Sequence, residues 1–561
     1  MQLELDSVLA THCVSDGSSI RDALEKIEQG EDRICFVIDD KGLLIRAVSD
    51  GDIRRALLKG QALDSPVHNI HNRTPIFAND GDSTEDTRKL FNKRINVVPV
   101  TNDSGCIVGL IRQYEALPVF DIKSRDIGVI GLGHVGLTLG LVLAEKGFNV
   151  SGFDVNDEII DTLIAKKPPF FENGLDQYIQ TYVGRNFRPI KKADTFRADV
   201  YVISVGTPFN KETDCLDDRH VTEAARYVGE RLKKNDLVVM RSTLPIGYTR
   251  NSVIPCLERT SGLVKGIDFF VSVCPERTTE GNALRELKSL PQIIGGFDPT
   301  SCEISMQLFN ENTQTVIDIG SLEAAEMCKL MDNTYRDIRF AFSNQLAILS
   351  EKLGLNLRNI VDKVNLSYER NDIPYPSPGV GGACLSKDPY VLKSSFDSHG
   401  LDGQFILEAR KINEAMPGRI VERASESLTM MGKSIVNCKI FIMGFAFKGD
   451  PETSDLRSST TLWFLGELRE KGVTNIFGYD PIIQKVEIEE LGIKYCSISE
   501  GFTGADAVFL MNNHRSFSKL NITHLLGQMN KPALFFDAWE ITPSSKLRSQ
   551  PGITSYGVGT Y

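Results

Sequence analysis

Short apolar runs that end in glycine or polar residues recur through most of the chain, with helical segments between them. The first series covers residues 127–130, 150–153, 198–205, 237–240 and 269–273. A second series begins near Lys433 and covers residues 440–443, 475–479, 507–511 and 533–536. Continuous apolar runs that alternate with helices are typical of buried strands in parallel sheets. The pattern therefore predicts two doubly wound α/β domains in succession.

One stretch between the two series has the composition of a single long helix. Residues 322–353 contain neither proline nor glycine, and Gly354 follows directly. About 32 residues at 1.5 Å each give a helix of roughly 48 Å, which predicts that it bridges two domains or forms a dimer seam. Lys329 and Asn333 lie one turn apart on this helix and share a face. Solvent exposure of both side chains is the alternative interpretation.

The first 120 residues contain an internal repeat. Each copy is expected to contain a helix followed by a two-stranded hairpin. In the first copy the helix covers residues 19–29 and the strands 34–38 and 43–45; in the second copy the helix covers residues 84–93 and the strands 95–100 and 106–111. Gly42 and Gly105 mark the two hairpin turns. Asp50 or Asp52 is expected to cap a further helix that carries two arginines. The repeat resembles a pair of CBS motifs, which implies binding of an adenine nucleotide and control of an attached enzyme. A purely structural or dimerising role is the alternative.

A glycine-rich sequence follows the first strand of the first α/β series. Gly131, Gly133 and Gly136 lie between that strand and a helical run, and Asp154 ends the next strand. The first glycine makes the turn, the second admits a pyrophosphate and the third allows close helix packing. Asp154 is placed to accept a hydrogen bond from a ribose hydroxyl, which favours NAD over NADP. The complete order of strand, glycines, helix, strand and acid predicts a dinucleotide site.

Polar residues follow three further strands of this series. Thr207, Thr243 and Glu276 each come shortly after an apolar run. Ligands of parallel sheets bind beyond the carboxyl ends of the strands, so these residues should face one crevice. Turns, caps and a solvated loop are the alternative interpretations.

Cys384 follows a glycine-rich loop that contains Gly381, and Lys387 and Asp388 come three and four residues later. Residues 385–391 have the pattern of a helix start, which would place Cys384 and Asp388 one turn apart on one face. A thiol beside a cation and near a helix start can have a lowered pKa and act as a nucleophile. A buried structural cysteine is the alternative.

Composition narrows the possible functions. A chain of 561 residues is too long for one domain, and its net charge of -11 argues against a nucleic-acid partner. No apolar run is long enough for a membrane span. Eleven cysteines without paired spacing favour reduced thiols and a cytoplasmic location. The sequence has no Cys/His cluster with zinc spacing, so no metal is expected.

Taken together, these motifs resemble the UDP-glucose/GDP-mannose dehydrogenase family of nucleotide-sugar 6-dehydrogenases. The resemblance implies an α/β fold with two Rossmann-like doubly wound domains joined by a long central helix, preceded by a CBS-pair α+β domain. The implied domains are a regulatory CBS pair (1–120), an NAD-binding domain (125–320), a central helical dimerisation and catalytic domain (321–430) and a UDP-sugar-binding domain (431–561). A homodimer or higher homo-oligomer is implied as well.

The resemblance also implies a four-electron, NAD-dependent oxidation of a sugar C6 alcohol to a carboxylate. Cys384 would hold the intermediate aldehyde as a thiohemiacetal, and the second oxidation would give a thioester that water hydrolyses. Lys329 and Asn333 would stabilise oxyanions, and Asp388 would hold or activate a water molecule with Lys329. Glu276 would be the general acid/base of hydrolysis, and Thr243 would position the water.

Ligand contacts are implied in the same way. The NAD contacts would be Gly131, Gly133, Val135, Gly136, Asp154, Thr207, Thr243, Lys387 and Arg457. The substrate contacts would be Glu276, Arg277, Lys329, Asn333, Tyr375, Ser377, Gly381 and Lys448. The glycine-rich loop departs from the family by having His134 where a tyrosine is common.

Two short segments bear on the substrate. UDP-glucose enzymes usually have Pro-Glu-Phe and Phe-Gly-Tyr-Gly-Gly, whereas this chain has Pro-Glu-Arg at 275–277 and Pro-Gly-Val-Gly-Gly at 378–382. With Glu280 and Gly281, this pattern is more similar to the UDP-N-acetylhexosamine branch, above all to UDP-N-acetyl-D-mannosamine dehydrogenases. The substrate implied is UDP-N-acetylmannosamine or UDP-N-acetylglucosamine, with UDP-glucose as the alternative. A nucleotide-sensing regulatory protein with an inactive dehydrogenase portion is a third hypothesis.

Overall fold

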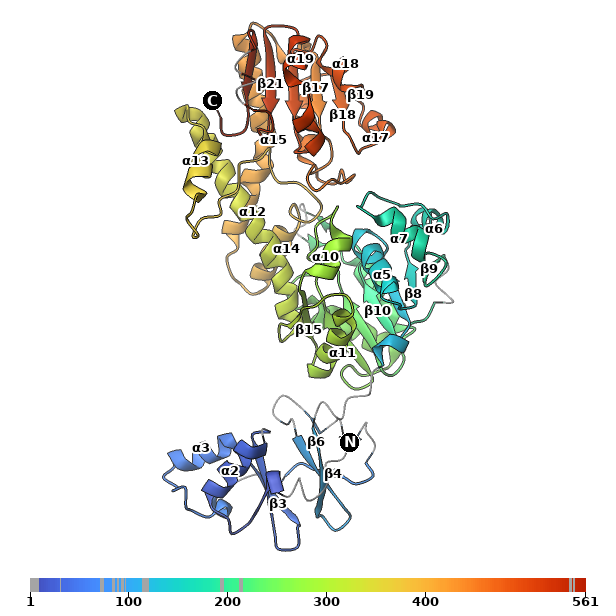
Figure 1. Cartoon of the computed structure of the whole chain (residues 1–561), viewed down its shortest axis with the longest axis vertical. Helices are drawn as coiled ribbons and strands as arrows, with labels where there is room; N and C mark the ends of the chain where they lie inside the picture. Colours follow the sequence, from blue (N-terminus) through green and yellow to red (C-terminus); the bar gives the residue numbers. More distant parts are fainter. Residues whose placement is uncertain are drawn as a thin grey trace. The chain divides into compact units, whose positions relative to one another are not determined.

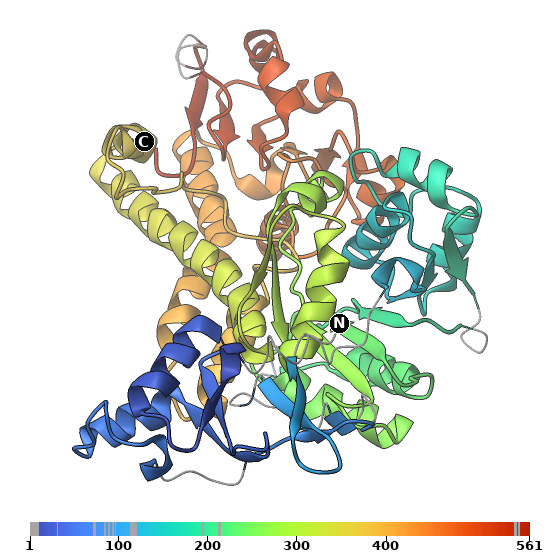
Figure 2. The ribbon, with the colours of Figure 1, turned by 60° about the horizontal axis from the view of Figure 1, so that its bottom comes forward.

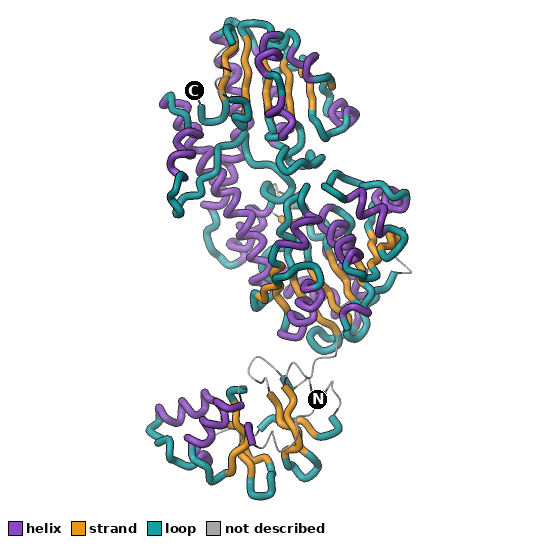
Figure 3. The backbone as a smooth tube through the Cα atoms, viewed as in Figure 1, coloured by secondary structure: helices purple, strands orange, loops and turns teal. Residues whose placement is uncertain are grey.

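The chain divides into two units, Met1–Asp121 and Ile122–Tyr561. The computed structural model describes residues 10–30, 32–70, 75–82, 86–87, 90–91, 95, 97–112, 121–191, 196–210, 215–543, 547 and 550–560. Most of the helix expected at residues 84–93 lies outside the described residues. Figure 3 shows that strands in the second unit form two separate sheets, each flanked by helices.

The first unit contains two copies of one strand arrangement, in which a short parallel strand joins an antiparallel hairpin. The strands are β1 (Cys13–Ser15), β2 (Ile34–Ile38), β3 (Leu44–Ser49), β4 (Ala78–Asn79), β5 (Val97–Thr101) and β6 (Ile107–Arg112). The two hairpin turns bond each other reciprocally. The N–H of Leu44 donates to the Gly105 carbonyl at 3.1 Å, and the N–H of Ile107 donates to the Gly42 carbonyl at 3.2 Å. This exchange confirms the internal repeat.

The helices of the first copy are α2 (Ile20–Gly30) and α3 (Asp50–Leu58), followed by the 3-10 helix η1 (Val67–Asn69). Neither Asp50 nor Asp52 is the N-cap of α3, contrary to the prediction, although Asp52 takes part in the cap. Ser49 is the N-cap, and its hydroxyl accepts a hydrogen bond from the Asp52 N–H, while the Asp52 side chain accepts from the Ser49 N–H. This reciprocal capping box needs a hydroxyl three residues before a carboxylate, which Asp50 cannot provide. Apolar residues such as Phe36 and Ile107 pack the two sheets together.

An eight-stranded sheet forms the first part of the second unit (Figure 1), with the strand order β16-β15-β14-β13-β10-β7-β8-β9. Neighbouring strands are parallel except β14 and β15. The strands are β7 (Ile127–Ile130), β8 (Val150–Phe153), β9 (Phe187–Ile190), β10 (Val200–Ile203), β13 (Asp236–Met240), β14 (Phe269–Val273), β15 (Gln292–Gly296) and β16 (Val316–Asp318). The order reverses at β7, so a crevice opens beyond the carboxyl ends of β7 and β10.

Helices cover both faces of this sheet, as a doubly wound fold requires. They are η2 (Ile122–Ser124), α5 (His134–Glu145), α6 (Asp157–Ile164), α7 (Leu175–Tyr182), α8 (Arg219–Gly229), the π-helix η4 (Thr249–Val253), α9 (Ile254–Ser261), α10 (Ala283–Ser289) and α11 (Pro299–Asn310). A two-stranded ribbon, β11 (Phe209–Asn210) and β12 (Cys215–Leu216), follows β10.

Four helices connect the two sheets: α12 (Leu322–Leu353), α13 (Leu357–Asn365), α14 (Asp388–Ser398) and α15 (Gln404–Met430). The Ser321 side chain caps the start of α12, and Gly354 ends it in a left-handed conformation with φ of 67°. Both bounds match the prediction. In Figure 2 the ribbons of α12 (yellow) and α15 (orange) cross, and the two helices are in contact.

A six-stranded, fully parallel sheet forms the last part, with the order β19-β18-β17-β20-β21-β22. Its strands are β17 (Ile440–Met443), β18 (Ile476–Tyr479), β19 (Lys494–Tyr495), β20 (Ala507–Leu510), β21 (Ala533–Asp537) and β22 (Ile553–Tyr556). Its helices are η5 (Ile435–Asn437), α16 (Thr460–Glu470), α17 (Lys485–Glu490), α18 (Ile498–Phe502), η6 (Arg515–Lys519) and α19 (Ile522–Gly527). The predicted α/β class with two Rossmann-like sheets and a long connecting helix is confirmed. Nowhere in the described residues does a helix have the length and apolar character needed to cross a membrane.

Candidate active site

The loop between β7 and α5 has the geometry of a dinucleotide-binding turn. Gly131 has φ of +93°, and a Cβ there would lie 2.8 Å from the Ser204 carbonyl oxygen. A Cβ on Gly136 would lie 1.9 Å from the Gly131 carbonyl oxygen, so only glycine lets α5 pack this closely on the loop. Gly133 is exposed, and a Cβ there would meet no atom within 4 Å. The open backbone N–H groups at a helix N-terminus fit the pyrophosphate of NAD.

Two neighbouring positions complete this part of the site. The Asp154 carboxylate, at the end of β8, accepts hydrogen bonds from the N–H groups of Leu132 at 2.7 Å and Asn156 at 2.9 Å. These bonds hold an acidic group beside the glycine-rich loop, where the ribose of a dinucleotide lies in this fold. Val135 is the second residue of α5 and is half-buried.

His134 is the first residue of α5, and its ring stacks on Phe170 with a centroid distance of 3.8 Å. Burial, and then the positive charge of Arg457, lower the pKa of His134 to about 4. The imidazole is therefore neutral at pH 7. A charge shifts a pKa in this way only from nearby. Arg457, which follows the first strand of the C-terminal sheet, therefore lies near the glycine-rich loop.

The polar residues that follow β10 and β13 are joined to the loop that carries Cys384. The Thr207 hydroxyl donates to the Thr243 carbonyl oxygen at 2.9 Å. Lys387 Nζ donates to Thr207 Oγ1 at 3.3 Å and to Asp388 Oδ1 at 2.8 Å. Thr207, Thr243 and Lys387 thus lie together, although they are far apart in the sequence.

Glu276 lies after β14 and is almost fully buried. Its carboxylate forms an ion pair with Arg241 and accepts hydrogen bonds from the N–H groups of Arg277 at 2.8 Å and Thr278 at 2.7 Å. Burial alone would raise the pKa of Glu276, but Arg241 and these bonds hold it below its ordinary value, with a further contribution from Lys329. The carboxylate is therefore ionised at pH 7.

Lys329 and Asn333 are buried on α12, so the alternative of solvent exposure is wrong for both. Asn333 Nδ2 donates to Asp388 Oδ2 at 2.5 Å. The Asp388 side chain is fully buried, and Lys387 supplies its second partner. Asn333, Asp388 and Lys387 thus connect α12 to the start of α14.

Cys384 is exposed to solvent. Desolvation of the sulfur, and then repulsion by Asp388, raise the pKa of the thiol above its ordinary value, although Lys329 and Lys387 act in the opposite direction. The expectation of a lowered pKa is wrong for the thiol in this structure. The helix start is also wrong, because α14 begins at Asp388 rather than residue 385. The Asp388 N–H nevertheless donates to the Cys384 carbonyl at 2.8 Å, which keeps the two residues one turn apart.

A loop of the C-terminal sheet closes one side of the site. Lys448 Nζ donates to the Glu280 carbonyl oxygen at 2.7 Å, and Arg457 Nη2 lies 3.6 Å from Glu280 Oε1. Arg457 also pairs with Asp455 at 2.6 Å. Burial, and then the negative charge of Asp455, raise the pKa of Glu280 to about 7. The charges of Arg457 and Glu280 also interact with the Cys384 thiol.

The remaining predicted substrate contacts lie at different places around this region. Arg277 Nε donates to Asp332 on α12 at 2.8 Å. The Tyr375 hydroxyl bonds to Asp362, and the Arg358 guanidinium lies 4.0 Å from the centre of the Tyr375 ring. The Ser377 side chain is buried and donates to the Gly379 carbonyl at 2.9 Å, so it holds its own loop. A Cβ on Gly381 would lie 2.4 Å from the Ser458 carbonyl oxygen.

The sequence did not assign a chemical role to two charged residues near this site, Arg241 and Glu280. Arg241 directly follows β13, as a binding residue of this fold can, but its partner Glu276 follows a different strand, β14, so the ion pair could not be read from the sequence. Glu280 entered only as part of a substrate-specific segment. Within the described residues, no group of three His, Cys, Asp or Glu side chains is placed to hold a metal ion.

Three successive regions of the chain match the models of three domains of one protein family. The matches are the NAD binding domain at residues 125–313, the central domain at 323–415 and the UDP binding domain at 441–544 of the UDP-glucose/GDP-mannose dehydrogenase family. The chain belongs to this family. It is an NAD-dependent nucleotide-sugar dehydrogenase. The CBS domain model also matches the first unit, at residues 10–59 and 67–120.

Individual members of the UDP-glucose/GDP-mannose dehydrogenase family support this assignment. An NDP-N-acetyl-D-galactosaminuronic acid dehydrogenase of Ralstonia nicotianae is 30% identical over 72% of this chain and 94% of its own length. A UDP-N-acetyl-D-mannosamine dehydrogenase of Pyrococcus horikoshii is 30% identical over 70% of this chain and 91% of its own. The solved structure of a UDP-D-ManNAc dehydrogenase from that organism has a TM-score of 0.70 and 29% identity, covering 77% of this chain and 99% of that one.

Proposed function

We propose that this dehydrogenase oxidises C6 of a UDP-N-acetylhexosamine to a carboxylate and reduces two NAD for each sugar. UDP-N-acetylmannosamine is the first candidate substrate, and UDP-N-acetylglucosamine is the second. The observation that carries the proposal is the arrangement around Cys384. Its charge neighbours include Lys329, Lys387 and Asp388, and Lys387 bonds to Thr207 at the strand ends of the NAD-binding sheet.

NAD, when bound at the glycine-rich loop, supplies the hydride acceptor for both oxidations. The alcohol loses a hydride and a proton to become an aldehyde. The Cys384 sulfur then bonds to C6, and the aldehyde oxygen takes a proton, giving a thiohemiacetal. Loss of a second hydride and proton gives a thioester, and water cleaves the bond between carbon and sulfur to release the acid and the thiol.

Each residue has a proposed role that agrees with its surroundings. Lys329 stabilises the oxyanions of the tetrahedral species as a buried cation. Asn333 donates one N–H to Asp388 and offers its second N–H to the same oxyanions. Asp388 holds the hydrolytic water with Lys329. Glu276, kept ionised by Arg241, takes a proton from that water, and Thr243 positions it.

NAD and the UDP-sugar are proposed to bind on opposite sides of Cys384. Gly131, Gly133, Val135, Gly136, Asp154, Thr207, Thr243, Lys387 and Arg457 would contact NAD. Glu276, Arg277, Lys329, Asn333, Tyr375, Ser377, Gly381 and Lys448 would contact the UDP-sugar. The hydrogen bond from Lys448 to Glu280 and the ion pair between Arg457 and Glu280 favour a closed site made by both sheets.

A substrate panel tests the proposal. NADH formation is measured with UDP-N-acetylmannosamine, UDP-N-acetylglucosamine and UDP-glucose at equal concentrations, and the acid product is quantified. We expect two NADH per sugar and a kcat/KM for one N-acetylated substrate at least tenfold above that for UDP-glucose. A preference for UDP-glucose would overturn the substrate assignment. Absence of turnover with every nucleotide-sugar would favour a regulatory protein with an inactive dehydrogenase portion.

We also propose that the chain forms a homodimer through α12. Large apolar side chains, each between 49% and 62% exposed, recur along this helix: Met327, Met331, Tyr335, Phe342, Leu349 and Leu353. Exposed apolar surface of this extent is typical of protein interfaces. Sedimentation should give about twice the chain mass of 62.2 kDa. A monomer at micromolar concentration would contradict the proposal, and Phe342→Glu should shift a true dimer towards monomer.

The first unit is proposed to bind an adenine nucleotide and to modulate the enzyme. Support comes from its reciprocally bonded repeat and from the CBS domain match. AMP, ADP and ATP are added to the full chain, and the thermal transition and the NADH rate are followed. No shift in either quantity with any of the three would exclude this role. A cytoplasmic location is proposed because all eleven cysteines are unpaired, as in a reducing compartment.

A further inference from the structure

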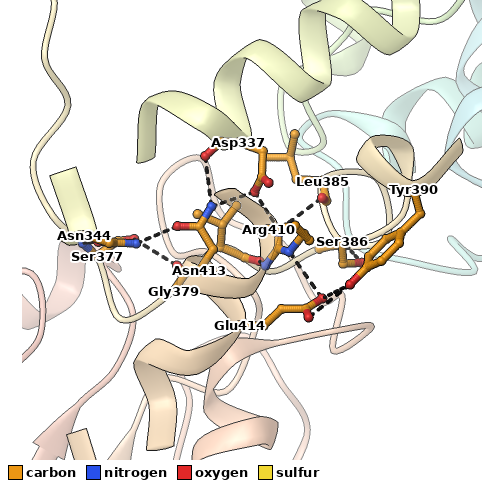
Figure 4. A network of polar contacts seen from close by, with 12 residues as sticks. Asp337, Asn344, Ser377, Gly379, Leu385, Ser386, Tyr390, Arg410, Asn413 and Glu414 are labelled. Atoms are coloured by element: carbon orange, nitrogen blue, oxygen red, sulfur yellow. Dashed lines mark hydrogen bonds and ion pairs between the residues drawn. The ribbon is translucent and has the colours of Figure 1, made fainter. Parts of the chain in front are cut away.

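Arg410 on α15 holds both ends of the loop that carries Cys384 (Figure 4). Its Nη2 donates to the Val380 carbonyl oxygen at 2.7 Å, and its Nη1 donates to the Leu385 carbonyl oxygen at 3.1 Å. Residues 381–384 lie between these two carbonyls and end in the thiol. A guanidinium is planar and presents its N–H donors in a fixed fork. One rigid group therefore sets the spacing of the two loop ends.

Arg410 pairs with two carboxylates, Glu414 and Asp337. Glu414 Oε1 lies 3.3 Å from Arg410 Nε and belongs to α15 itself, whereas Asp337 belongs to the helix that carries the predicted oxyanion donors. Asp337 Oδ1 on α12 lies 2.6 Å from Arg410 Nη1, and both side chains are 0% exposed. Asp337 follows Asn333 by one turn and Lys329 by two, so the three side chains share a face of α12. The buried ion pair thus joins the helix of Lys329 and Asn333 directly to the Cys384 loop.

Neighbouring amides extend the same connection to the segment before the loop (Figure 4). Asn413 Nδ2 donates to Asp337 Oδ1 at 2.8 Å, and Asn344 Nδ2 donates to Asn413 Oδ1 at 2.9 Å. Asn344 Oδ1 in turn accepts from the Ser377 N–H at 2.8 Å. A Cβ on Gly379 would lie 2.7 Å from the Asn413 carbonyl oxygen, so the chain passes this network in close contact. Buried networks of this kind make the elements that they join rigid.

We propose that Arg410, together with Asp337, is a positioning residue that fixes the Cys384 thiol relative to Lys329 and Asn333. This inference rests on the proposed cysteine chemistry. Capture of the aldehyde requires that the sulfur reach C6 while the aldehyde oxygen meets the oxyanion donors. The bond that forms joins sulfur to carbon, and the oxygen takes the proton. A loop displaced by about 1 Å fails in this step, with a loss on the order of 100-fold.

Retention of the aldehyde distinguishes a misplaced Cys384 thiol from a general folding defect in an Arg410 variant. In Arg410→Lys, the ammonium keeps the charge opposite Asp337 but cannot reach both carbonyls in a fixed fork. Substrate turnover is measured with and without semicarbazide, which traps free aldehyde. We expect NADH per sugar to fall from two towards one, with a matching yield of trapped aldehyde. A general folding defect lowers both oxidations together and releases no aldehyde.

A second variant removes the ion pair without leaving a buried charge alone. Replacing a buried ion pair by apolar residues of similar size often preserves stability. The combined variant Asp337→Leu with Arg410→Met should therefore stay folded, with a somewhat lower thermal transition because the Val380 and Leu385 carbonyls lose their donor, and should still release aldehyde. Wild-type acid formation in this folded variant would overturn the proposal.

Arg423 provides a matched control on the same two helices. Its Nη1 pairs with Glu351 on α12 at 2.9 Å and donates to the Gly557 carbonyl at 3.0 Å. Arg423→Lys loses the same fork geometry, but away from the Cys384 loop. We expect two NADH per sugar and no trapped aldehyde from this control. Aldehyde release equal to that of Arg410→Lys would show that the effect is not specific to Arg410.

A measurement without substrate separates this proposal from the proposed function. Iodoacetamide labelling of Cys384 is followed by peptide mass spectrometry, with exposed Cys215 as the internal reference. A loosened loop in Arg410→Lys should relieve the desolvation of the Cys384 sulfur, and a thiol pKa lower by about one unit would raise the labelling ratio of Cys384 to Cys215 about tenfold. Arg423→Lys should leave this ratio unchanged. If no UDP-sugar is oxidised, the proposed function fails while this ratio still decides the positioning role. An unchanged ratio in both Arg410 variants would overturn it.

Discussion

Gly133 and Gly136 lie in one short loop but should respond to alanine in opposite ways. A Cβ on Gly136 would lie 1.9 Å from the Gly131 carbonyl oxygen and 2.3 Å from Ser204 Oγ. An ordinary contact needs about 3.4 Å, so α5 would have to move by roughly 1.5 Å from β7 and β10. We expect Gly136→Ala to lower the stability of the NAD-binding sheet by about 1–3 kcal/mol or more, as overpacking does.

The Cβ added by Gly133→Ala would meet no atom within 4 Å, and φ of -70° at this position suits any residue. The fold should therefore stay intact, while the added methyl group stands where the pyrophosphate approaches the backbone. We expect an unchanged thermal transition and NAD affinity at least tenfold weaker.

Calorimetry and NAD titration of the two variants provide the assay. The transition of the NAD-binding sheet should shift in Gly136→Ala only, while NAD affinity should fall in both. Normal NAD affinity in Gly133→Ala would refute the pyrophosphate position. A fully stable Gly136→Ala with normal affinity would refute the packing argument.

Three further outcomes follow from the same reasoning. Arg241→Met leaves the Glu276 carboxylate buried without its cation and should cost about 3–5 kcal/mol in urea unfolding; a cost below 1 kcal/mol would contradict a buried ion pair. Burial raises the pKa of Asp236 to about 7, so its contribution to stability falls as the pH rises from about 4 to 7. Asp236→Asn should therefore gain up to about 4 kcal/mol over the wild type at pH 8 and little at pH 4; equal gains at both pH values would contradict this assignment. Ser49→Ala removes the capping box of α3 and should cost about 1 kcal/mol in the transition of the first unit, with exposed Ser104→Ala as a surface control.

Local patterns predicted most of the fold. The bounds of α12 follow from its composition and from Gly354, and the glycine-rich loop follows from the spacing of Gly131, Gly133 and Gly136. The reciprocal bonding of the two hairpin turns also agrees with the repeat seen in the sequence.

Contacts between distant residues were harder to predict. Arg410 on α15 bonds to a loop more than twenty residues earlier, and no local periodicity identifies Val380 and Leu385 as its partners. The pKa of Cys384 was predicted in the wrong direction because Lys387 lies only three residues away in the sequence. In space, the charge of Lys387 is balanced by Asp388 at 2.8 Å. Net electrostatics depend on all neighbours and on desolvation, which sequence spacing does not give.

The most direct test of the central claim is the number of NADH formed per UDP-N-acetylmannosamine by the wild type and by Cys384→Ala. The account predicts two NADH and one acid for the wild type. It predicts no acid for Cys384→Ala, with at most one NADH and a matching amount of aldehyde trapped by semicarbazide. Two NADH and one acid from Cys384→Ala would contradict a covalent role for this cysteine.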